Sequence, residues 1–271
     1  MSEAPPSESA IHVSAGTAED SDPQLAHTLM RGLRVLQCFN AAQPRLGNRD
    51  LAELTGLPKP TISRLTHTLS KLGYLRRAAG SLRFEVGPAA LCLGYPVLAE
   101  LSFRRMVMPH LQKLAQEVDG IAVIAVRDRL RMVTLESADQ RDLFGRRPNI
   151  GSTRDLIGST LGLCWLVHAT STEREDLMRQ VAAQASSVID RVRSDLEVGR
   201  RQLGRHGYVS LRNVLAPNTS TLATPLFRRP GSDLFVLGCS VEAPWESLKE
   251  KERSAADQLH AAARHISQGM G

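Results

Sequence analysis

The sequence predicts an α+β protein of two domains: a helical N-terminal domain that ends in a β-hairpin, and a C-terminal antiparallel sheet flanked by helices. Three observations predict this fold. Short amphipathic helices separated by glycines precede residue 73, apolar and polar residues alternate around a glycine at 74–86, and strand and helix patterns mix after residue 106. The length of 271 residues is enough for two domains with separate cores.

Charge and composition place the domain boundaries. Residues 1–24 carry five acidic and no basic groups and few large apolar side chains, which predicts a disordered tail. Residues 25–88 hold ten basic against three acidic groups and form the helical domain. Residues 89–105 are expected to be a linker helix disturbed by Gly94 and Pro96, and residues 106–271 the second domain. The concentrated positive charge predicts a polyanionic partner, with nucleic acid the first candidate.

Several classes of protein are excluded by composition. The four cysteines lie far apart without a C-x-x-C pair, so neither a disulfide framework nor a zinc site is expected, and no cofactor is predicted. The first residues lack the basic and apolar segments of a signal peptide. The charge-free stretches 86–99 and 156–172 are too short and too interrupted to span a bilayer. We therefore expect a soluble, cytoplasmic protein with no membrane partner.

Three helices are expected before residue 73. The first begins at Thr28 as its cap and ends near Asn40, and a second, short helix is closed by Gly56. The third has a proline in its first turn and ends at Gly73. The apolar residues that repeat at helical spacing are Leu29, Leu33, Leu36 and Phe39 in the first helix, Leu51 and Leu54 in the second, and Ile62, Leu65, Leu69 and Leu72 in the third.

The second and third helices, joined by a glycine turn, predict a helix-turn-helix, and the hairpin after them predicts a wing. A helix of this kind fits the major groove of DNA, with its N-terminal residues near the base edges. Arg64 is the expected base contact, because a guanidinium can bond two guanine acceptors at once. The candidate DNA ligands are Arg49, Lys59, Thr61, Ser63, Arg64, His67, Lys71 and the wing arginines Arg76, Arg77 and Arg83. Because any surface helix has a polar face, the pattern of 59–71 alone is equally typical of a solvated surface.

The second domain mixes helix and strand patterns. Helices are expected at 109–118, 156–168, 190–206 and 248–266. Strands are expected at 121–126 and 132–135, which form a hairpin, and at 220–226 and 234–241, with a turn at Pro230 and Gly231.

Several segments resemble the IclR family of bacterial transcription regulators. They are residues 57–69 (LPKPTISRLTHTL), 72–75 (LGYL), 84–88 (FEVGP) and 91–94 (LCLG), and later 108–115 (MPHLQKLA), 205–208 (RHGY) and 222–226 (LATPL). The resemblance implies a winged helix-turn-helix, a linker helix used in dimerisation, and an effector-binding domain related to the GAF fold. It also implies assembly as dimers or pairs of dimers.

The resemblance further implies where an effector binds. Carried over by position, the effector ligands are Ser159, Thr160, Thr221, Ala223, Ser240 and Glu242. Serines and threonines at such positions often satisfy only the local backbone. The chain also departs from the family pattern at Leu163, where members often carry lysine, and over 212–219. Arg127, Arg129 and Arg154 are further candidates for a carboxylate ligand, although scattered surface arginines are the commoner explanation.

These patterns together predict a transcription regulator, not an enzyme, that binds a near-palindromic duplex as a symmetric oligomer and responds to a small organic or aromatic acid. Two alternatives stay open. One is an enzyme with a GAF-like domain that a winged helix delivers to DNA, although the chain lacks H-E-x-x-H, G-x-S-x-G and phosphate-loop motifs. The other is an adaptor whose winged helix binds protein, which weak salt dependence would favour.

Overall fold

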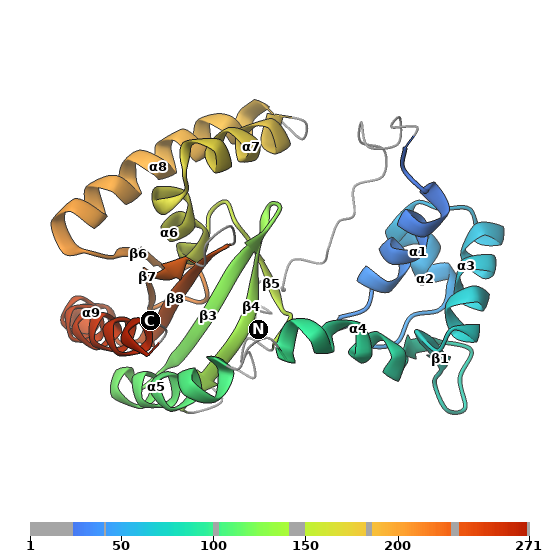
Figure 1. Ribbon diagram of the computed structural model, residues 1–271, viewed down its shortest axis with the longest axis horizontal. Helices are drawn as coiled ribbons and strands as arrows, with labels where there is room; N and C mark the ends of the chain where they lie inside the picture. Colours follow the sequence, from blue (N-terminus) through green and yellow to red (C-terminus); the bar gives the residue numbers. More distant parts are fainter. Residues whose placement is uncertain are drawn as a thin grey trace. The chain divides into compact units, whose positions relative to one another are not determined.

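The computed structural model describes residues 24–40, 42–99, 103–140, 150–182, 186–228 and 233–269. The chain divides into two compact units, residues 1–100 and 101–271 (Figure 1). The acidic tail predicted for residues 1–24 and the turn predicted at Pro230 and Gly231 lie outside the described residues, except for Gln24.

The described part of the N-terminal unit has three helices, a hairpin and a fourth helix that follows the hairpin. Its elements are α1 (His27–Gln37), α2 (Asn48–Thr55), α3 (Lys59–Lys71), β1 (Leu75–Arg77), β2 (Phe84–Val86) and α4 (Pro88–Ala99). Strands β1 and β2 pair antiparallel, with Leu75 opposite Val86. The core joins the inner faces of α1, α2 and α3 to the hairpin through Val35, Leu51, Ile62, Leu75 and Phe84. The three helices and the hairpin predicted before residue 88 are therefore confirmed.

Two details of this unit differ from the sequence prediction. Helix α1 begins at His27 after Ala26, without a side-chain cap, so the assignment of Thr28 as the cap was wrong. Leu29 and Leu33 recur at helical spacing but are 64% and 47% exposed. The apolar repeat predicted the helix correctly because spacing follows from helical geometry, yet spacing alone does not show which apolar face the core covers.

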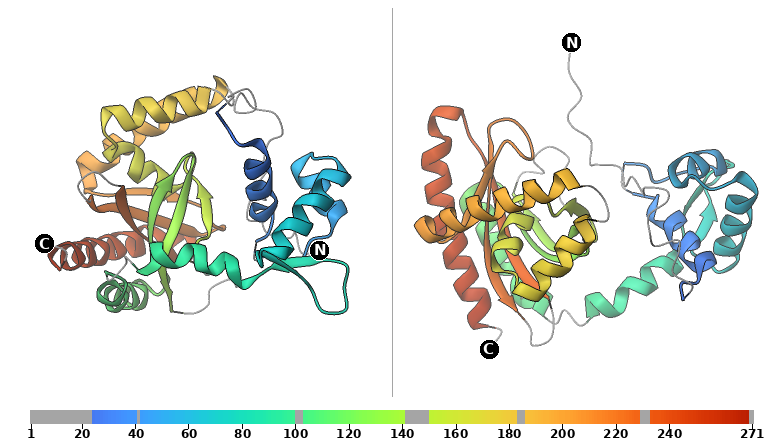
Figure 2. Two further views of the ribbon diagram at one scale, coloured as in Figure 1. Left: turned by 45° about the vertical axis from the view of Figure 1, so that its right-hand side comes forward. Right: turned by 90° about the horizontal axis from the view of Figure 1, so that it is seen from above.

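The C-terminal unit is one antiparallel sheet between two helical layers. Its elements are α5 (Phe103–Val118), β3 (Ile121–Asp128), β4 (Arg131–Asp139), β5 (Thr153–Asp155), α6 (Thr160–His168), α7 (Ser171–Ala182), α8 (Ser186–His206), β6 (Val209–Arg212), β7 (Thr219–Arg228), β8 (Leu234–Glu242) and α9 (Trp245–Gln268). The strand order is β5-β4-β3-β8-β7-β6. Helices α5 and α9 cover one face, and α6 with α8 covers the other (Figures 1 and 2).

Helix α5 begins earlier than the sequence predicts. The predicted helix started at Pro109, but α5 starts at Phe103, inside the range expected for the linker. Val107, Leu111 and Leu114 are at most 1% exposed. Because their spacing places them on one side of the helix, α5 packs on the sheet along its length and Pro109 is accommodated within it.

The core on the α6 side of the sheet depends on a glycine. A Cβ atom added to Gly238 of β8 would lie 2.7 Å from Cδ2 of Leu161 in α6. Glycine at this position therefore lets α6 approach the sheet closely. The apolar cluster that results includes Leu161, Trp165, Ala223 and Val236.

Candidate functional site

Helix α3 is held by an apolar face and presents a polar one. Ile62, Leu65 and Leu69 are at most 9% exposed and pack in the core of the N-terminal unit. The turn into α3 passes through Gly56, whose φ of 69° lies in the left-handed region. The side chains on the outer face of α3 therefore face solvent, and among them are Ser63, Arg64, His67 and Lys71.

The first turn of α3, like that of any helix, has backbone N–H groups without an intrahelical acceptor. Its N-cap is Pro58, which makes no side-chain cap, and Pro60 lies in the first turn. The N–H groups of a helix start are orphan donors that bind phosphate well, and the helix dipole adds to this. Lys59 is exposed and Thr61 half-buried at this end. Both therefore lie where a phosphate of a bound duplex could be held.

The basic residues of this unit fall into two groups. The side chains of Lys59, Arg64, His67 and Lys71 on α3 form no hydrogen bond or ion pair with the rest of the chain that the structure describes. By contrast, the arginine candidates outside α3 all contact their own domain. These are Arg49, paired with Glu53 at 3.0 Å, Arg76, paired with Glu85 at 2.8 Å, Arg83, paired with Asp50 at 3.3 Å, and Arg77, which bonds the Leu82 carbonyl at 3.0 Å. Among the candidate DNA ligands, the α3 group is thus the one whose charge is available to an incoming anion.

Two residues near the α3 surface were missed by the sequence analysis. Thr68 is exposed one turn after Arg64, and its hydroxyl donates to the Arg64 carbonyl at 3.0 Å. The same helical spacing that selected Arg64 could have selected it. Thr66 is buried, and its hydroxyl joins α3 to Asn48 of α2 at 3.2 Å. No sequence pattern indicated that contact, because it depends on how the two helices cross.

In the C-terminal unit, two of the candidate effector residues meet directly. The hydroxyls of Thr221 in β7 and Ser240 in β8 lie 3.0 Å apart, and the two residues are opposite each other in the sheet register. They lie on the sheet face that α6 covers, since Ala223 and Gly238 on the same register face pack under it. Ala223 is fully buried and can only form an apolar wall there.

The two candidates at the start of α6 differ in their hydrogen bonding. The Ser159 hydroxyl caps α6 by accepting from the Gly162 N–H at 3.2 Å. The Thr160 hydroxyl is buried and has no partner among the described residues. Since a buried hydroxyl without a partner is costly, Thr160 is the candidate that most needs a further polar group. Glu242 is half-buried at the end of β8.

Of the three arginines considered for a carboxylate ligand, Arg127 and Arg154 have partners within the protein, whereas in the described part of the chain Arg129 takes part in a hydrogen bond only through its carbonyl, which accepts from Arg127 at 2.6 Å. The Arg127 guanidinium lies 4.5 Å from the ring centroid of Trp165 and pairs with Asp176 at 3.2 Å. A carboxylate at Arg127 would compete with an existing ion pair.

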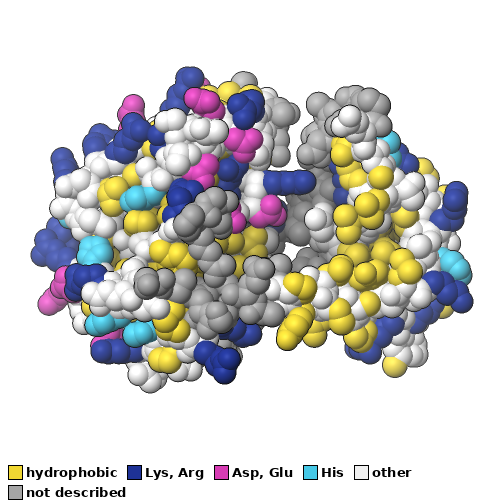
Figure 3. Space-filling model, viewed as in Figure 1, with side chains coloured by type: hydrophobic (Ala, Val, Ile, Leu, Met, Phe, Trp, Pro, Cys, Tyr) yellow, Lys and Arg dark blue, Asp and Glu magenta, His cyan; other side chains and the backbone are white. Residues whose placement is uncertain are grey.

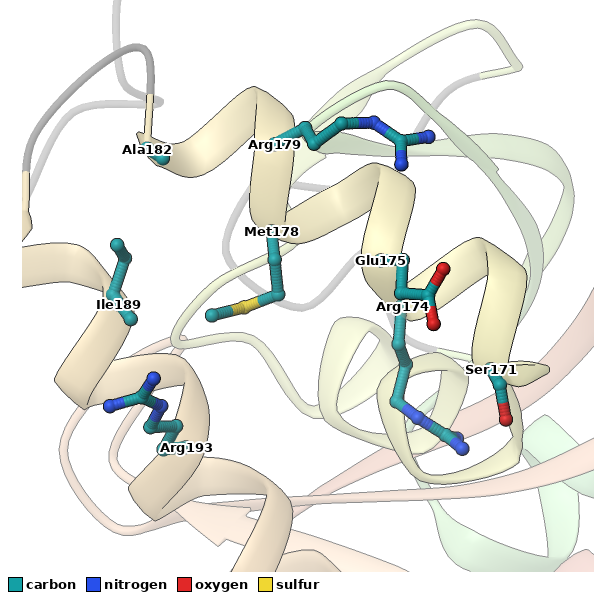
Figure 4. A pocket seen from close by; sticks show the side chains of 8 residues that line it. All are labelled: Ser171, Arg174, Glu175, Met178, Arg179, Ala182, Ile189 and Arg193. Atoms are coloured by element: carbon teal, nitrogen blue, oxygen red, sulfur yellow. The ribbon is translucent and has the colours of Figure 1, made fainter.

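An open groove of about 630 Å³ lies between α7 and α8. Met178 of α7 and Ile189 of α8 face this space (Figure 4). None of the six candidate effector residues lines the groove. The structure therefore does not combine the groove and the polar positions of β7 and β8 into one site.

The buried cysteines of this unit are not nucleophiles. Burial raises the pKa of the Cys239 thiol in β8 to about 12, and burial also raises the pKa of the Cys164 thiol in α6. Both groups stay protonated near neutral pH, and the thiolate is the reactive form. Among the described residues, no three His, Cys, Asp or Glu side chains are grouped as metal ligands.

Within the described part of the chain, no helix has the length and apolar character needed to cross a membrane.

Comparison with known proteins places both units in one family. The model of the IclR helix-turn-helix domain matches residues 28–79, and the model of the bacterial transcriptional regulator IclR C-terminal domain matches residues 96–268. The HTH-type transcriptional regulator TsaQ1/TsaQ2 of Comamonas testosteroni is 34% identical over 246 residues, which are 89% of this chain and 88% of that protein.

Solved structures agree with this assignment. An IclR family transcriptional regulator from Brucella abortus has a TM-score of 0.75 and 33% identity, over 94% of this chain and 96% of that one. An IclR homologue complexed with 4-hydroxybenzoate, from Microbacterium hydrocarbonoxydans, shares the fold with a TM-score of 0.63 and 20% identity, over 88% of this chain and 99% of that one. The exposed cationic face of α3 and these matches together show that the chain belongs to the IclR family of DNA-binding transcriptional regulators.

Proposed function

We propose that a small organic or aromatic acid binds the C-terminal unit and controls how this regulator binds DNA. The observation that carries the proposal is the set of hydroxyls on the α6 side of the sheet. The Thr160 hydroxyl is buried and has no hydrogen-bond partner in the described part of the chain, and Thr221 and Ser240 present a hydroxyl pair from adjacent strands. Effector pockets of proteins are mostly apolar with a few placed polar groups, and the surrounding cluster of Leu161, Ala223 and Val236 has that character.

Two observations support an acidic effector, one at the start of α6 and one from a relative. Backbone N–H groups and the helix dipole favour a carboxylate at a helix N-terminus. An IclR homologue of the same fold is described in complex with 4-hydroxybenzoate, which is an aromatic acid. The hydroxyls of this chain can bond such a carboxylate or a phenol group.

We further propose that the protein acts as a symmetric dimer, or as a pair of dimers, on a near-palindromic duplex in the cytoplasm. Two α3 helices would enter successive major grooves about one helical turn apart, because the two-fold axis of the protein must match that of the site. The effector would act by binding one arrangement of the dimer more tightly than the other.

The test is a thermal-shift screen with 4-hydroxybenzoate and other small aromatic and aliphatic acids. The acid that stabilises the wild type should stabilise Ser240→Leu little or not at all, because a leucine fills the space beside Thr221 and removes one hydroxyl. Binding of the variant to a duplex selected by the wild type from a random-sequence pool should be unchanged, because Ser240 lies in the other unit from α3.

A matched pair of milder variants controls for damage to the sheet. Ser240→Ala and Ser220→Ala remove the same hydroxyl from the paired strands β8 and β7, but Ser220 lies on the opposite face of the sheet. Only Ser240→Ala should reduce the increase in unfolding temperature that the acid causes. If an acid raised the unfolding temperature of the wild type and of Ser240→Leu equally, the effector would bind elsewhere. If none of the acids in the screen stabilised the wild type, this class of effector would be rejected.

A further inference from the structure

The tip of the hairpin presents one large apolar side chain to solvent. Leu82 lies between β1 and β2 and is 83% exposed, more than any other large hydrophobic residue in the described part of the chain. The same hairpin buries Leu75 and Phe84 almost completely. A single exposed leucine is ordinary on a protein surface. This one lies at the tip of the hairpin that follows α3, so its position directs attention to what it contacts when α3 binds DNA.

Hydrogen bonds within the hairpin tip hold it in one conformation. The Ala78 N–H donates to the Arg83 carbonyl at 3.0 Å, and the Ser81 N–H donates to the Ala78 carbonyl at 3.1 Å. The Ser81 hydroxyl accepts from the Arg83 N–H at 3.1 Å. Gly80 supplies the positive φ of 65° that the turn requires. Leu82 is therefore presented from a fixed loop.

The two arginines beside Leu82 brace the loop. The Arg77 guanidinium donates to the Leu82 carbonyl at 3.0 Å and lies 4.9 Å from the ring centroid of Phe84. The Arg83 guanidinium donates to the Arg45 carbonyl at 3.1 Å and pairs with Asp50 at 3.3 Å. Both guanidinium groups are directed back to their own domain, which leaves Leu82 as the side chain that the tip offers outward.

DNA offers a site for such a side chain next to the major groove. The hairpin follows directly after α3, so we expect a duplex with α3 in its major groove to bring the neighbouring minor groove toward the tip. That groove is about 6 Å wide, which is too narrow for a helix and wide enough for a loop tip. Apolar side chains inserted there unstack base steps, and pyrimidine–purine steps unstack most easily.

We propose that Leu82 inserts into the minor groove beside the α3 site and favours a flexible pyrimidine–purine step there. The inference rests on the DNA binding of the family and is independent of the effector proposed above. Arg77 and Arg83 act as positioning residues that hold the tip. Because a leucine side chain makes no hydrogen bond to a base, it recognises the DNA sequence through the ease with which the base step deforms.

The test compares Leu82→Ala with Leu82→Met on duplexes that the wild type selects from a random-sequence pool. Leu82→Ala should bind about tenfold more weakly, whereas Leu82→Met, which keeps an apolar side chain of similar size, should bind within about twofold of the wild type. A second selection with Leu82→Ala should recover the same half-sites without enrichment of the flanking pyrimidine–purine step. Both variants should unfold at the wild-type temperature, because the side chain is exposed.

The salt dependence separates this role from a charge contact. In plots of log Kd against log salt concentration, Leu82→Ala should keep the wild-type slope, whereas Lys59→Ala should reduce it by about one. Wild-type binding in the same assay tests the DNA-binding function itself. The proposal would be overturned if Leu82→Ala bound the selected duplex as tightly as the wild type and selected the same flanking step. A slope for Leu82→Ala that differs from the wild-type slope would also overturn it. A lower oligomeric mass for Leu82→Ala would overturn it too, because it would show that Leu82 contacts a second copy of the chain.

Discussion

Arg64 differs from three other arginines of its unit in what surrounds it. Arg49, Arg76 and Arg83 each lie within 3.3 Å of a carboxylate oxygen of the same domain. Exposed pairs of this kind add little to stability, but they must be broken or shared before the arginine can bond a phosphate or a base. Arg64 has no such cost among the described residues, and it faces solvent from the middle of α3.

We therefore predict that Arg64→Ala weakens binding to a selected duplex by about 1–3 kcal/mol and relaxes the preference at one base pair. The thermal stability of the variant should be unchanged, because the guanidinium makes no contact that the fold needs. Fluorescence anisotropy with the selected duplex and with single-base substitutions measures both effects.

Arg201→Ala is the matched control for Arg64. It removes the same exposed charge from α8 of the other unit and should leave affinity unchanged. Arg49→Ala is an intermediate case, since its charge is already shared with Glu53. An Arg64→Ala variant with wild-type affinity and specificity would remove Arg64 from the DNA-binding surface.

The sequence could predict the polar face of α3 but not the pairing of the wing arginines. The face follows from the helical period, because Ile62, Leu65 and Leu69 fix which side is buried and so which side carries Arg64. The pairing of Arg83 with Asp50 joins residues far apart in the chain, and it depends on how the hairpin packs against α2. No local pattern contains that information.

At the scale of elements, the turn between α2 and α3 depends on Gly56. Its φ of 69° costs a residue with a Cβ atom about 1–2 kcal/mol. We predict that Gly56→Ala lowers the free energy of unfolding of the N-terminal unit by about that amount. Gly94→Ala is the matched control, because Gly94 lies within α4 and an added Cβ atom would meet nothing within 4 Å. That control should be neutral or slightly stabilising.

The two tryptophans make this measurement specific. Trp165 and Trp245 both belong to the C-terminal unit, so tryptophan fluorescence reports the unfolding of that unit alone. In urea, Gly56→Ala should shift part of the far-ultraviolet circular dichroism transition to lower concentration and leave the fluorescence transition in place. An unchanged dichroism transition would contradict the prediction.

Some elements of the C-terminal unit carried too weak a signal to predict. Helix α7 buries only Leu177 and Val181 among the residues of its length, and its other positions are mostly polar. Strands β5 and β6 have three and four residues. Such segments adopt their structure through contacts with neighbouring elements, which the local sequence does not contain. For example, β6 is a strand because it pairs with β7. The longer strands β3, β4, β7 and β8 were predicted because each contains a segment rich in strand-forming residues, although β4 extends to Asp139, beyond the predicted 132–135.

At the scale of the whole molecule, the N-terminal unit exposes more apolar surface than a single subunit explains. Leu29 and Leu33 on α1 and Leu91, Leu93 and Tyr95 on α4 are all 47–73% exposed. Figure 3 shows apolar side chains gathered over the α1 and α4 part of this unit. Contiguous exposed apolar surface on a soluble protein marks an interaction site, and burying one leucine there contributes about 1.5–3 kcal/mol.

We predict that this apolar surface joins two copies of the chain, as the proposed dimer requires. Leu91→Glu should lower the oligomeric mass seen by sedimentation equilibrium, because a carboxylate buried at the interface would have no partner. The variant should also bind a two-half-site duplex no more tightly than a single half-site. Leu82→Glu makes the same substitution at the hairpin tip and should leave the mass unchanged. If Leu91→Glu kept the wild-type mass, the surface formed by α1 and α4 would not be the dimer interface, and the pairing of the α3 helices would have to come from the C-terminal unit.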